Sequence, residues 1–267
     1  MTRQSSRVVV VTGSTRGIGY GLAWEFLKAG CKVVVCGRSQ ESTDQAVAKL
    51  ARAYAPERVC GWPCNVRSYV QAQTLWVRAC QRFGHVDIWI NNAGLGTGQR
   101  DLWTHPEEEM AAVVDTNITG TLYGAKVAIS GMLEQGFGAV YNMEGLGSDG
   151  RRVKGLTLYG TTKRAVRYLT DGLVSETKGT PVLVGRLSPG MVTTDFLVGR
   201  YDQRSEEWEK AKRMFNILAD RLETVTPWLV GKVLANTRHG ASFQWLTAPK
   251  ILGRFLTAPF VTRDVVS

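Results

Sequence analysis

The feature that most constrains the fold of this chain is a run of four valines that leads directly into a glycine-rich turn. Val8–Val11 is short, apolar and β-branched, which is typical of a strand buried on both faces. Gly13, Gly17 and Gly19 follow, and the next apolar side chains recur at helical spacing. A buried strand, a tight turn and an amphipathic helix in this order predict the first half of a βαβ unit.

The same alternation continues along most of the chain. Short strands are predicted, in chain order, at residues 8–11, 33–35, 59–64, 86–90, 139–141, 181–187 and 242–246. Helical patterns separate the strands, and Ser42 is the predicted N-cap of the second helix. With right-handed crossovers this alternation predicts a Rossmann-type, doubly wound parallel sheet with helices on both faces and a ligand crevice beyond the carboxyl ends of its strands.

Length and composition favour a single domain over residues 1–267. The chain is 44% hydrophobic and 21% charged, and no Pro/Ser-rich linker interrupts it, so one substantial core is expected. The rhythm of strands and helices breaks after the sixth predicted strand. We therefore expect a helical substrate-loop insertion at about 190–240, and a last strand with an apolar tail at about 241–267.

The net charge of +10 comes from scattered lysines and arginines. This pattern fits a phosphate-rich cofactor or an anionic membrane surface better than nucleic acid, which is not expected as a partner. No apolar run is long enough to span a bilayer, and the charged start does not lead into a signal-peptide stretch, so neither a membrane span nor export is expected.

The five cysteines are odd in number and lie in strand-like or helix-like runs, which indicates free thiols in a reducing compartment. Cys60 and Cys64 could form half of a metal site with one of the dispersed histidines. Their spacing matches no common zinc pattern, so no metal is expected.

The glycine-rich turn is a candidate phosphate site. Gly13, Gly17 and Gly19 lie between a buried strand and a helix N-terminus, where free backbone N–H groups and the helix dipole attract a pyrophosphate. Glycines at this spacing also occur in plain tight turns. The strand before the turn and the helix after it favour a dinucleotide.

The end of the second strand indicates which dinucleotide is bound. An NAD-binding unit usually has Asp or Glu there to hold the ribose 2′-OH, whereas this chain has Arg38 and Ser39, and Arg16 lies in the glycine loop. Two guanidinium groups suit a 2′-phosphate, so NADPH or NADP⁺ is the expected cofactor. The alternative is that Arg38 is a solvated turn residue.

Tyr159 and Lys163 stand at i and i+4, which places them on the same face of a helix. An adjacent cation favours phenolate and lowers the pKa of a tyrosine. Tyr159 could then exchange a proton with a carbonyl or alcohol oxygen near neutral pH.

The glycine loop, residues 91–94, Asn117, the Tyr159 and Lys163 pair, and residues 189–190 together resemble the classical short-chain dehydrogenase/reductase family over nearly the whole chain. The resemblance implies that Tyr159 is the catalytic acid/base, that Lys163 lowers its pKa and holds the nicotinamide ribose, and that the backbone of Asn117 binds a proton-relay water. It also places Asn65 where an adenine-contacting Asp is common. The residues expected against the cofactor are Gly13, Ser14, Arg16, Gly17, Ile18, Gly19, Arg38, Ser39, Asn65, Val66, Asn92, Ala93, Gly94, Tyr159, Lys163, Pro189, Gly190, Val192 and Thr194.

Within that family, four stretches are similar to the chlorophyll b reductases: residues 12–20, 141–150, 187–195 and 244–247. The resemblance implies NADPH-dependent reduction of the C7-formyl group of chlorophyll(ide) b to a hydroxymethyl group. Reduction of another bulky apolar aldehyde or ketone, and a noncatalytic NADPH-binding scaffold or sensor, are the alternatives. The expected location is cytoplasmic in a bacterium, and the plastid stroma or thylakoid surface in an alga or plant whose transit peptide has been removed.

The group that holds the substrate oxygen departs from the classical pattern. That pattern has a serine three residues after the strand-ending Asn142, where this chain has Gly145. Ser148 is the nearest hydroxyl, and the glycine-rich loop could bring it toward Tyr159. Glu144 is the rival, either protonated by burial or bound to another part of the substrate. A third possibility is that Ser148 only forms a turn while Tyr159 acts alone.

The C-terminal segment combines apolar and basic residues: Phe243, Trp245, Ile251, Leu252, Phe255, Leu256 and Phe260 lie among Lys250, Arg254 and Arg263. It could form a wall for a bulky ligand or a peripheral membrane surface whose basic residues face headgroups. It could equally be a subunit contact, and a homo-oligomer is expected.

Overall fold

A seven-stranded parallel sheet forms the centre of the computed structural model, which describes residues 7–194, 197, 199 and 204–266. In the described part of the chain the strand order is β3-β2-β1-β4-β5-β6-β9, and every paired strand is parallel. The strands are β1 (Val8–Val11), β2 (Lys32–Gly37), β3 (Val59–Pro63), β4 (Ile88–Asn91), β5 (Gly138–Met143), β6 (Val182–Ser188) and β9 (Ala241–Gln244). The prediction of a single-domain doubly wound sheet is confirmed.

The valines of β1 divide between the two faces of the sheet. Val9 and Val11 lie in one apolar core, Val8 and Val10 lie in the other, and all four are fully buried. Full burial of one such side chain stabilises the fold by about 1.5–3 kcal/mol. The central strand therefore holds both helical layers, as its sequence predicts.

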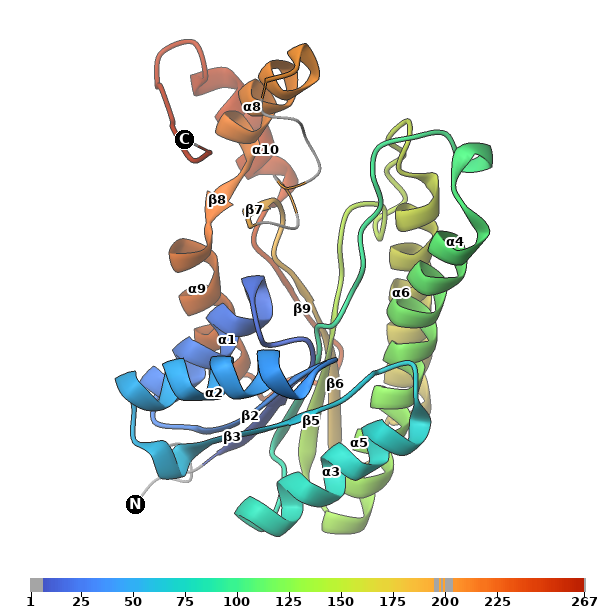
Figure 1. The fold of residues 1–267 in the computed structure, drawn as a ribbon, viewed down its shortest axis with the longest axis vertical. Coiled ribbons are helices and arrows are strands. Elements are labelled where there is room, and N and C mark those ends of the chain that lie inside the picture. Colours follow the sequence, from blue (N-terminus) through green and yellow to red (C-terminus); the bar gives the residue numbers. More distant parts are fainter. Residues whose placement is uncertain (1–6, 195–196, 198, 200–203, 267) are drawn as a thin grey trace.

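Helices cover both faces of the sheet (Figure 1). They are α1 (Gly17–Lys28), α2 (Gln40–Ala53), α3 (Tyr69–Phe83), α4 (Glu107–Val114), α5 (Gly120–Gln135), α6 (Thr157–Glu176), α8 (Glu206–Leu218), α9 (Leu222–Ala235) and α10 (Ala248–Thr257). The layer of α1, α2 and α9 contributes to the first core, and the layer of α3, α5 and α6 to the second. No helix among the described residues is long and apolar enough to cross a bilayer.

The predicted N-cap of the second helix was wrong by three residues. Ser39, not Ser42, caps α2, because its backbone is still extended after β2 and its Oγ accepts a hydrogen bond from the N–H of Ser42 at 3.3 Å. Ser42 lies inside the first turn, where its hydroxyl donates to the carbonyl of Ser39.

The predicted insertion at 190–240 contains two different parts. Two-residue strands β7 (Val192–Thr193) and β8 (Asp220–Arg221) pair in parallel and flank α8, outside the main sheet. By contrast, α9 packs on α1 and buries Val225, Leu229 and Val233, so it belongs to a layer of the fold. Residues 1–6, 267 and part of the predicted insertion, namely 195–196, 198 and 200–203, lie outside the described residues.

Candidate active site

A cavity of about 2160 Å³ lies among the loops that leave the carboxyl ends of the strands. It runs from the glycine loop, past Tyr159, to α8 and α10. Of the residues predicted for the site, only Ser14 and Asn117 do not line it. The topology of the sheet therefore brings the predicted cofactor and catalytic residues into one space.

The geometry of the glycine loop is compatible with a bound pyrophosphate. Gly13 and Gly17 adopt φ values of +63° and +56°, which favour glycine. A Cβ on Gly17 would meet only the Thr194 side chain, at 3.8 Å, so the loop backbone is open to the cavity there. α1 has no acidic residue in its first turn, and its N-cap Arg16 makes no side-chain capping bond. These features fit a phosphate at the helix N-terminus.

The loop after β4 clamps the glycine loop in place. The Oγ1 of Thr12 accepts hydrogen bonds from the backbone N–H groups of Asn92 and Ala93, each at 3.0 Å. The side-chain amide of Asn92 donates back to the carbonyls of Thr12 and Gly13, at 2.9 and 3.2 Å. Thr12, absent from the sequence predictions, therefore joins the two loops of the candidate cofactor site.

Two predicted cofactor residues use their side chains in other ways. Ser14 is fully buried; its Oγ donates to the carbonyl of Val11 at 2.6 Å and accepts from the N–H of Cys36 at 3.0 Å. The side chain of Ser14 is thus turned toward the strands, away from the cavity. The Oδ1 of Asn65 accepts from the N–H of Arg67 at 3.2 Å, although Asn65 still lines the cavity.

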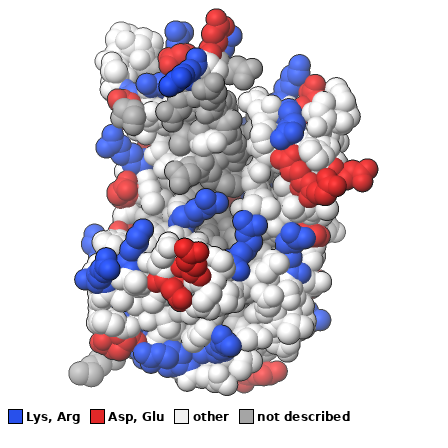
Figure 2. Space-filling model, viewed as in Figure 1, with Lys and Arg blue, Asp and Glu red and all other residues white. Residues whose placement is uncertain are grey.

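Cations line the glycine-loop end of the cavity. Arg16 and Arg38 line this end and are exposed, and Lys49 of α2 is a further exposed cation there that the sequence predictions did not include. In Figure 2 lysine and arginine side chains lie along the lower edge of the hollow in the surface, with acidic side chains close to them. The helical register of α2 could have indicated Lys49, because it faces the same way as Ser42 and Gln45, which also line the cavity.

The first two turns of α6 carry Tyr159 and Lys163. The Lys163 Nζ lies 5.8 Å from the centroid of the Tyr159 ring and donates to the carbonyl of Met143 at 3.0 Å. Burial lowers the pKa of Lys163 to about 8, and the Glu144 carboxyl acts in the opposite direction. The predicted phenol and ammonium pair is therefore formed, with the ammonium close to the end of β5.

Asn117 lies beneath the cavity, within a π-helical turn at Asp115–Thr119. Its side-chain amide donates to the carbonyl of Leu95 at 2.8 Å and to the Thr162 Oγ1 at 3.0 Å. Its Oδ1 accepts from the N–H of Leu95 at 2.7 Å, and its backbone carbonyl accepts from Thr121. In the described structure its side chain connects the loop after β4 to α6.

Gly145 occupies the place of the classical serine and lies directly against the Tyr159 hydroxyl. A Cβ built on Gly145 would collide with that hydroxyl and would lie 3.2 Å from two carbons of Lys163. The hydroxyl of Ser148 is buried beside the cavity and donates to the Oε2 of Glu144 at 3.3 Å. The loop thus brings the two rival residues together.

Glu144 is a buried carboxylate beside two arginines. Its Oε1 lies 3.5 Å from Arg167 and 3.8 Å from Arg186, and its side chain is 3% exposed. That Oε1 and two guanidinium nitrogens of Arg186 have no hydrogen-bond partner. Burial raises the pKa of Glu144, and the two arginines lower it. This cluster was absent from the sequence predictions because its members come from three places, namely the loop after β5, α6 and β6.

The far end of the cavity has many apolar side chains, with charged ones from the same loops and helices, such as Arg151, Lys154 and Lys210, among them. Its walls come from the loops after β4 and β5, from the segment after β6 and from α8 and α10. The apolar side chains there are Leu95, Leu146, Val153, Leu156, Met191, Leu197, Met214, Phe215, Leu218, Leu246, Ile251 and Phe255. This lining suits a bulky apolar ligand next to Tyr159.

Sequence comparisons identify relatives with named activities. A chloroplastic chlorophyll(ide) b reductase of Oryza sativa subsp. japonica is 39% identical over 232 residues, covering 85% of this chain and 66% of that protein. A probable chlorophyll(ide) b reductase of Arabidopsis thaliana is 35% identical over 272 residues, covering 96% and 54%. The chain therefore spans about half to two thirds of the length of these curated relatives.

Structural comparison gives the same fold. The actinorhodin polyketide ketoreductase, solved with NADPH, superposes with a TM-score of 0.81 at 27% identity, covering 92% of this chain and 97% of that one. A 3-ketoacyl-(acyl-carrier-protein) reductase from Brucella melitensis gives a TM-score of 0.78 at 21% identity, covering 90% and 96%, a likeness of fold alone. The sequence profile of the short chain dehydrogenases matches residues 7–205. With this match over most of its length, the chain belongs to the short-chain dehydrogenase family of oxidoreductases.

Proposed function

We propose that this protein is an NADPH-dependent reductase of a carbonyl group on a bulky apolar substrate. The observation that carries the proposal is one continuous cavity that contains the glycine loop, the Tyr159 and Lys163 pair and an apolar far wall. A nicotinamide cofactor bound at the loop would supply the hydride. In this proposal Tyr159 supplies the proton that the carbonyl oxygen receives.

The residues around Tyr159 have separate tasks. The Lys163 ammonium lies beside the phenol and stabilises its charged form. The carbonyl of Met143 holds that ammonium, and the side chain of Asn117 fixes the neighbouring loop to α6. The predicted role of Asn117 in holding a relay water through its backbone stays a prediction.

Ser148 is the residue that we propose donates a hydrogen bond to the substrate oxygen. It is buried, lines the cavity and is oriented by Glu144. In this structure the Ser148 hydroxyl donates to the Glu144 Oε2, so a substrate oxygen would have to replace Glu144 as the acceptor of that hydrogen bond.

The cofactor preference that we propose is for NADPH over NADH. Arg16 and Arg38 line the end of the cavity that would receive the adenosine ribose, and neither position offers a carboxylate to bind a free 2′-OH. Guanidinium groups form charge-assisted hydrogen bonds with phosphate, so the additional phosphate strengthens binding.

The C7-formyl group of chlorophyll(ide) b is the substrate that we propose. Two relatives carry that activity in their names, and the volume and apolar lining of the cavity suit a large flat molecule. The location that we propose is the plastid for a plant or algal source, as in these chloroplastic relatives, and the cytoplasm for a bacterial source. A homo-oligomer is also part of this proposal.

The basic residues of the C-terminal segment gather around one carboxylate. Lys250, Arg254 and Arg263 turn toward Asp220, so these cations do not face outward to headgroups. Leu252, Leu256 and Phe260 are exposed, at 62%, 66% and 87%. Peripheral membrane contact or subunit contact through these apolar side chains stays a prediction.

Oxidation of NADPH, followed at 340 nm, tests the proposed function directly. The assay compares chlorophyll b and chlorophyllide b with a panel of bulky and small aldehydes and ketones. Turnover of the formyl pigments above that of the other carbonyls would support the assignment. Turnover of another carbonyl alone would replace the substrate, and NADPH binding without any turnover would favour the scaffold alternative.

A further inference from the structure

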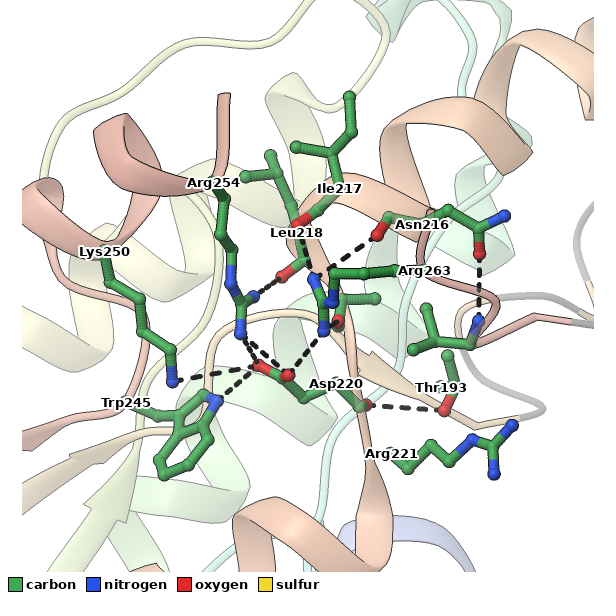
Figure 3. A network of polar contacts seen from close by, with 12 residues as sticks. Thr193, Asn216, Ile217, Leu218, Asp220, Arg221, Trp245, Lys250, Arg254 and Arg263 are labelled. Atoms are coloured by element: carbon green, nitrogen blue, oxygen red, sulfur yellow. Dashed lines mark hydrogen bonds and ion pairs between the residues drawn. The ribbon is translucent and has the colours of Figure 1, made fainter. Parts of the chain in front are cut away.

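Asp220 joins the elements that form the far wall of the cavity (Figure 3). Its side chain is 8% exposed and lies at the start of β8, directly after α8. The Arg254 Nη2 contacts both carboxylate oxygens, at 2.8 and 2.7 Å, and the Arg263 Nη2 donates to Oδ1 at 2.8 Å. The indole N–H of Trp245 donates to Oδ2 at 2.6 Å. One carboxylate thus receives hydrogen bonds from three separate C-terminal positions.

The two arginines also bind the end of α8. Arg254 donates to the carbonyl of Leu218 at 2.7 Å, and Arg263 donates to those of Ile217 and Ala219 at 2.6 and 2.8 Å. These are the final carbonyls of a helix, which have no partner within the helix and attract cations. The same side chains therefore neutralise Asp220 and cap α8.

The elements held in this way carry substrate-facing side chains. Phe215 and Leu218 of α8, and Ile251 and Phe255 of α10, line the cavity. In the described part of the chain, α8 also packs on an apolar cluster around Trp208, Phe215 and Ala219, and its Asn216 Oδ1 accepts a hydrogen bond from the N–H of Val265. The hydrogen bonds and ion pairs around Asp220 therefore make a large contribution to holding α8 and α10 in place.

Asp220 is also connected to the segment that is predicted to contact the nicotinamide. Its N–H donates to the carbonyl of Met191 at 3.0 Å, and β8 pairs with β7, with Asp220 opposite Val192. Val192 and Thr194 both line the cavity. The carboxylate therefore lies between the segment after β6 and the wall of α8 and α10.

We infer that Asp220 is a positioning residue for the bulky substrate: through Arg254, Arg263 and Trp245 it holds α8 and α10 at the separation that the apolar ligand fills. This inference rests on the proposed function, because it takes the apolar wall to be the substrate site. Asp220 contacts no reacting atom. Its loss should weaken binding of a large substrate and spare the proton transfer at Tyr159.

The test compares Asp220→Asn with Asp264→Asn in the full chain with NADPH. Asp264 is a matched control, because it is an exposed carboxylate in the same tail, and its contact with Arg221 uses only its backbone carbonyl. Amide hydrogen exchange in α8 and α10 should become at least about tenfold faster in Asp220→Asn and stay unchanged in the control. The affinity for NADPH should be unchanged in both variants.

The kinetic readout separates a failure of this inference from a failure of the proposed function. KM for chlorophyll b should rise about tenfold or more in Asp220→Asn, with kcat/KM for a small aromatic aldehyde near the wild-type value. If the wild-type protein reduces neither carbonyl, the proposed function fails, and the exchange result still decides whether Asp220 holds α8 and α10 in place.

If Asp220→Asn does not fold, Arg263→Gln is the second variant. It removes one of the side chains that donate to Asp220, and it should produce the same changes in hydrogen exchange and KM with a smaller magnitude. Wild-type exchange and KM in the folded variant would overturn the inference.

Discussion

The two ends of the cavity are built in different ways. At the cofactor end, backbone loops are fixed on neighbouring strands by Thr12 and Asn92, and Gly13 packs against Ala93. At the substrate end, α8 and α10 lie outside the sheet and are joined by side chains on Asp220. The first end depends on the topology of the sheet, and the second depends on a few charges. A change of substrate therefore requires no change in the central sheet.

Tyr159→Phe tests the point where the two ends meet, and we expect it to have the largest effect. The variant removes one oxygen and little volume, so folding and NADPH affinity should stay near wild type. Turnover should fall about 10²- to 10⁴-fold, the usual loss when a general acid is removed. Steady-state kinetics and calorimetric titration with NADPH measure the two quantities.

Lys163→Ala is the informative partner of that variant. It should reduce both turnover and NADPH affinity, because the resemblance to the family places Lys163 against the nicotinamide ribose as well as beside the phenol. Wild-type turnover in Tyr159→Phe would show that another group donates the proton.

Ser148→Ala tests whether the substrate end also supplies a hydrogen-bond donor. If Ser148 holds the substrate oxygen, kcat should fall about 10²- to 10³-fold, with little change in NADPH affinity. Glu144→Gln should be milder, because an amide can still hydrogen-bond to Ser148. A large loss in Glu144→Gln beside a near-normal Ser148→Ala would reverse the two roles.

Gly145→Ser gives a matched comparison at the same loop. It restores the serine of the classical family pattern, yet its Cβ would collide with the Tyr159 hydroxyl. We therefore expect it to lower turnover rather than to raise it. Increased turnover would show that the loop can move aside and that a hydroxyl at residue 145 is the better donor.

The cofactor end was largely predictable from sequence, because its signal is local. Gly13, Gly17 and Gly19 directly follow the strand that positions them, and Tyr159 and Lys163 lie within one turn of a helix. Asp220 gave no such signal: its partners Trp245, Arg254 and Arg263 lie 25, 34 and 43 residues away in sequence. A lone aspartate becomes recognisable only when the tertiary fold brings such partners together.

Ser14 and Glu144 show a second limit of the sequence. A motif predicts that Ser14 lies in the loop, but not that its hydroxyl turns inward to β1 and β2. Similarly, Glu144 could be placed at the end of β5, whereas its arginine neighbours come from α6 and β6. Side-chain direction depends on packing across elements, which no local pattern records.

Arg38→Asp changes the cofactor end alone, with a smaller expected effect. A charge-assisted hydrogen bond contributes about 1.5–3 kcal/mol, and for an exposed arginine the lower value, about tenfold in affinity, is the better expectation. The variant should lose the preference for NADPH over NADH and keep KM for the carbonyl substrate. Equal calorimetric affinities for the two cofactors in the unmodified protein would contradict the assignment of Arg16 and Arg38.

The pH dependence of catalysis tests the Tyr159 and Lys163 pair, where the two ends of the cavity meet, and we expect the smallest effect here. Burial lowers the pKa of Lys163 to about 8, so its ammonium is lost as the pH rises through that value. Since the ammonium is the form that stabilises phenolate, kcat/KM for NADPH should fall above about pH 8, reaching about tenfold below its plateau near pH 9.

Unfolding would not explain that fall. With a pKa near 8 in the folded protein and about 10.5 in the unfolded chain, Lys163 binds fewer protons in the folded state between these two values. Its contribution to the free energy of unfolding therefore increases with pH across this window, while activity decreases. Lys163→Arg keeps its charge throughout and should flatten the profile if it retains activity. If kcat/KM of the wild-type protein stayed level to pH 9.5, the Lys163 ammonium would persist to that pH. The pairing with Tyr159 would then raise the pKa of Lys163 by more than burial lowers it.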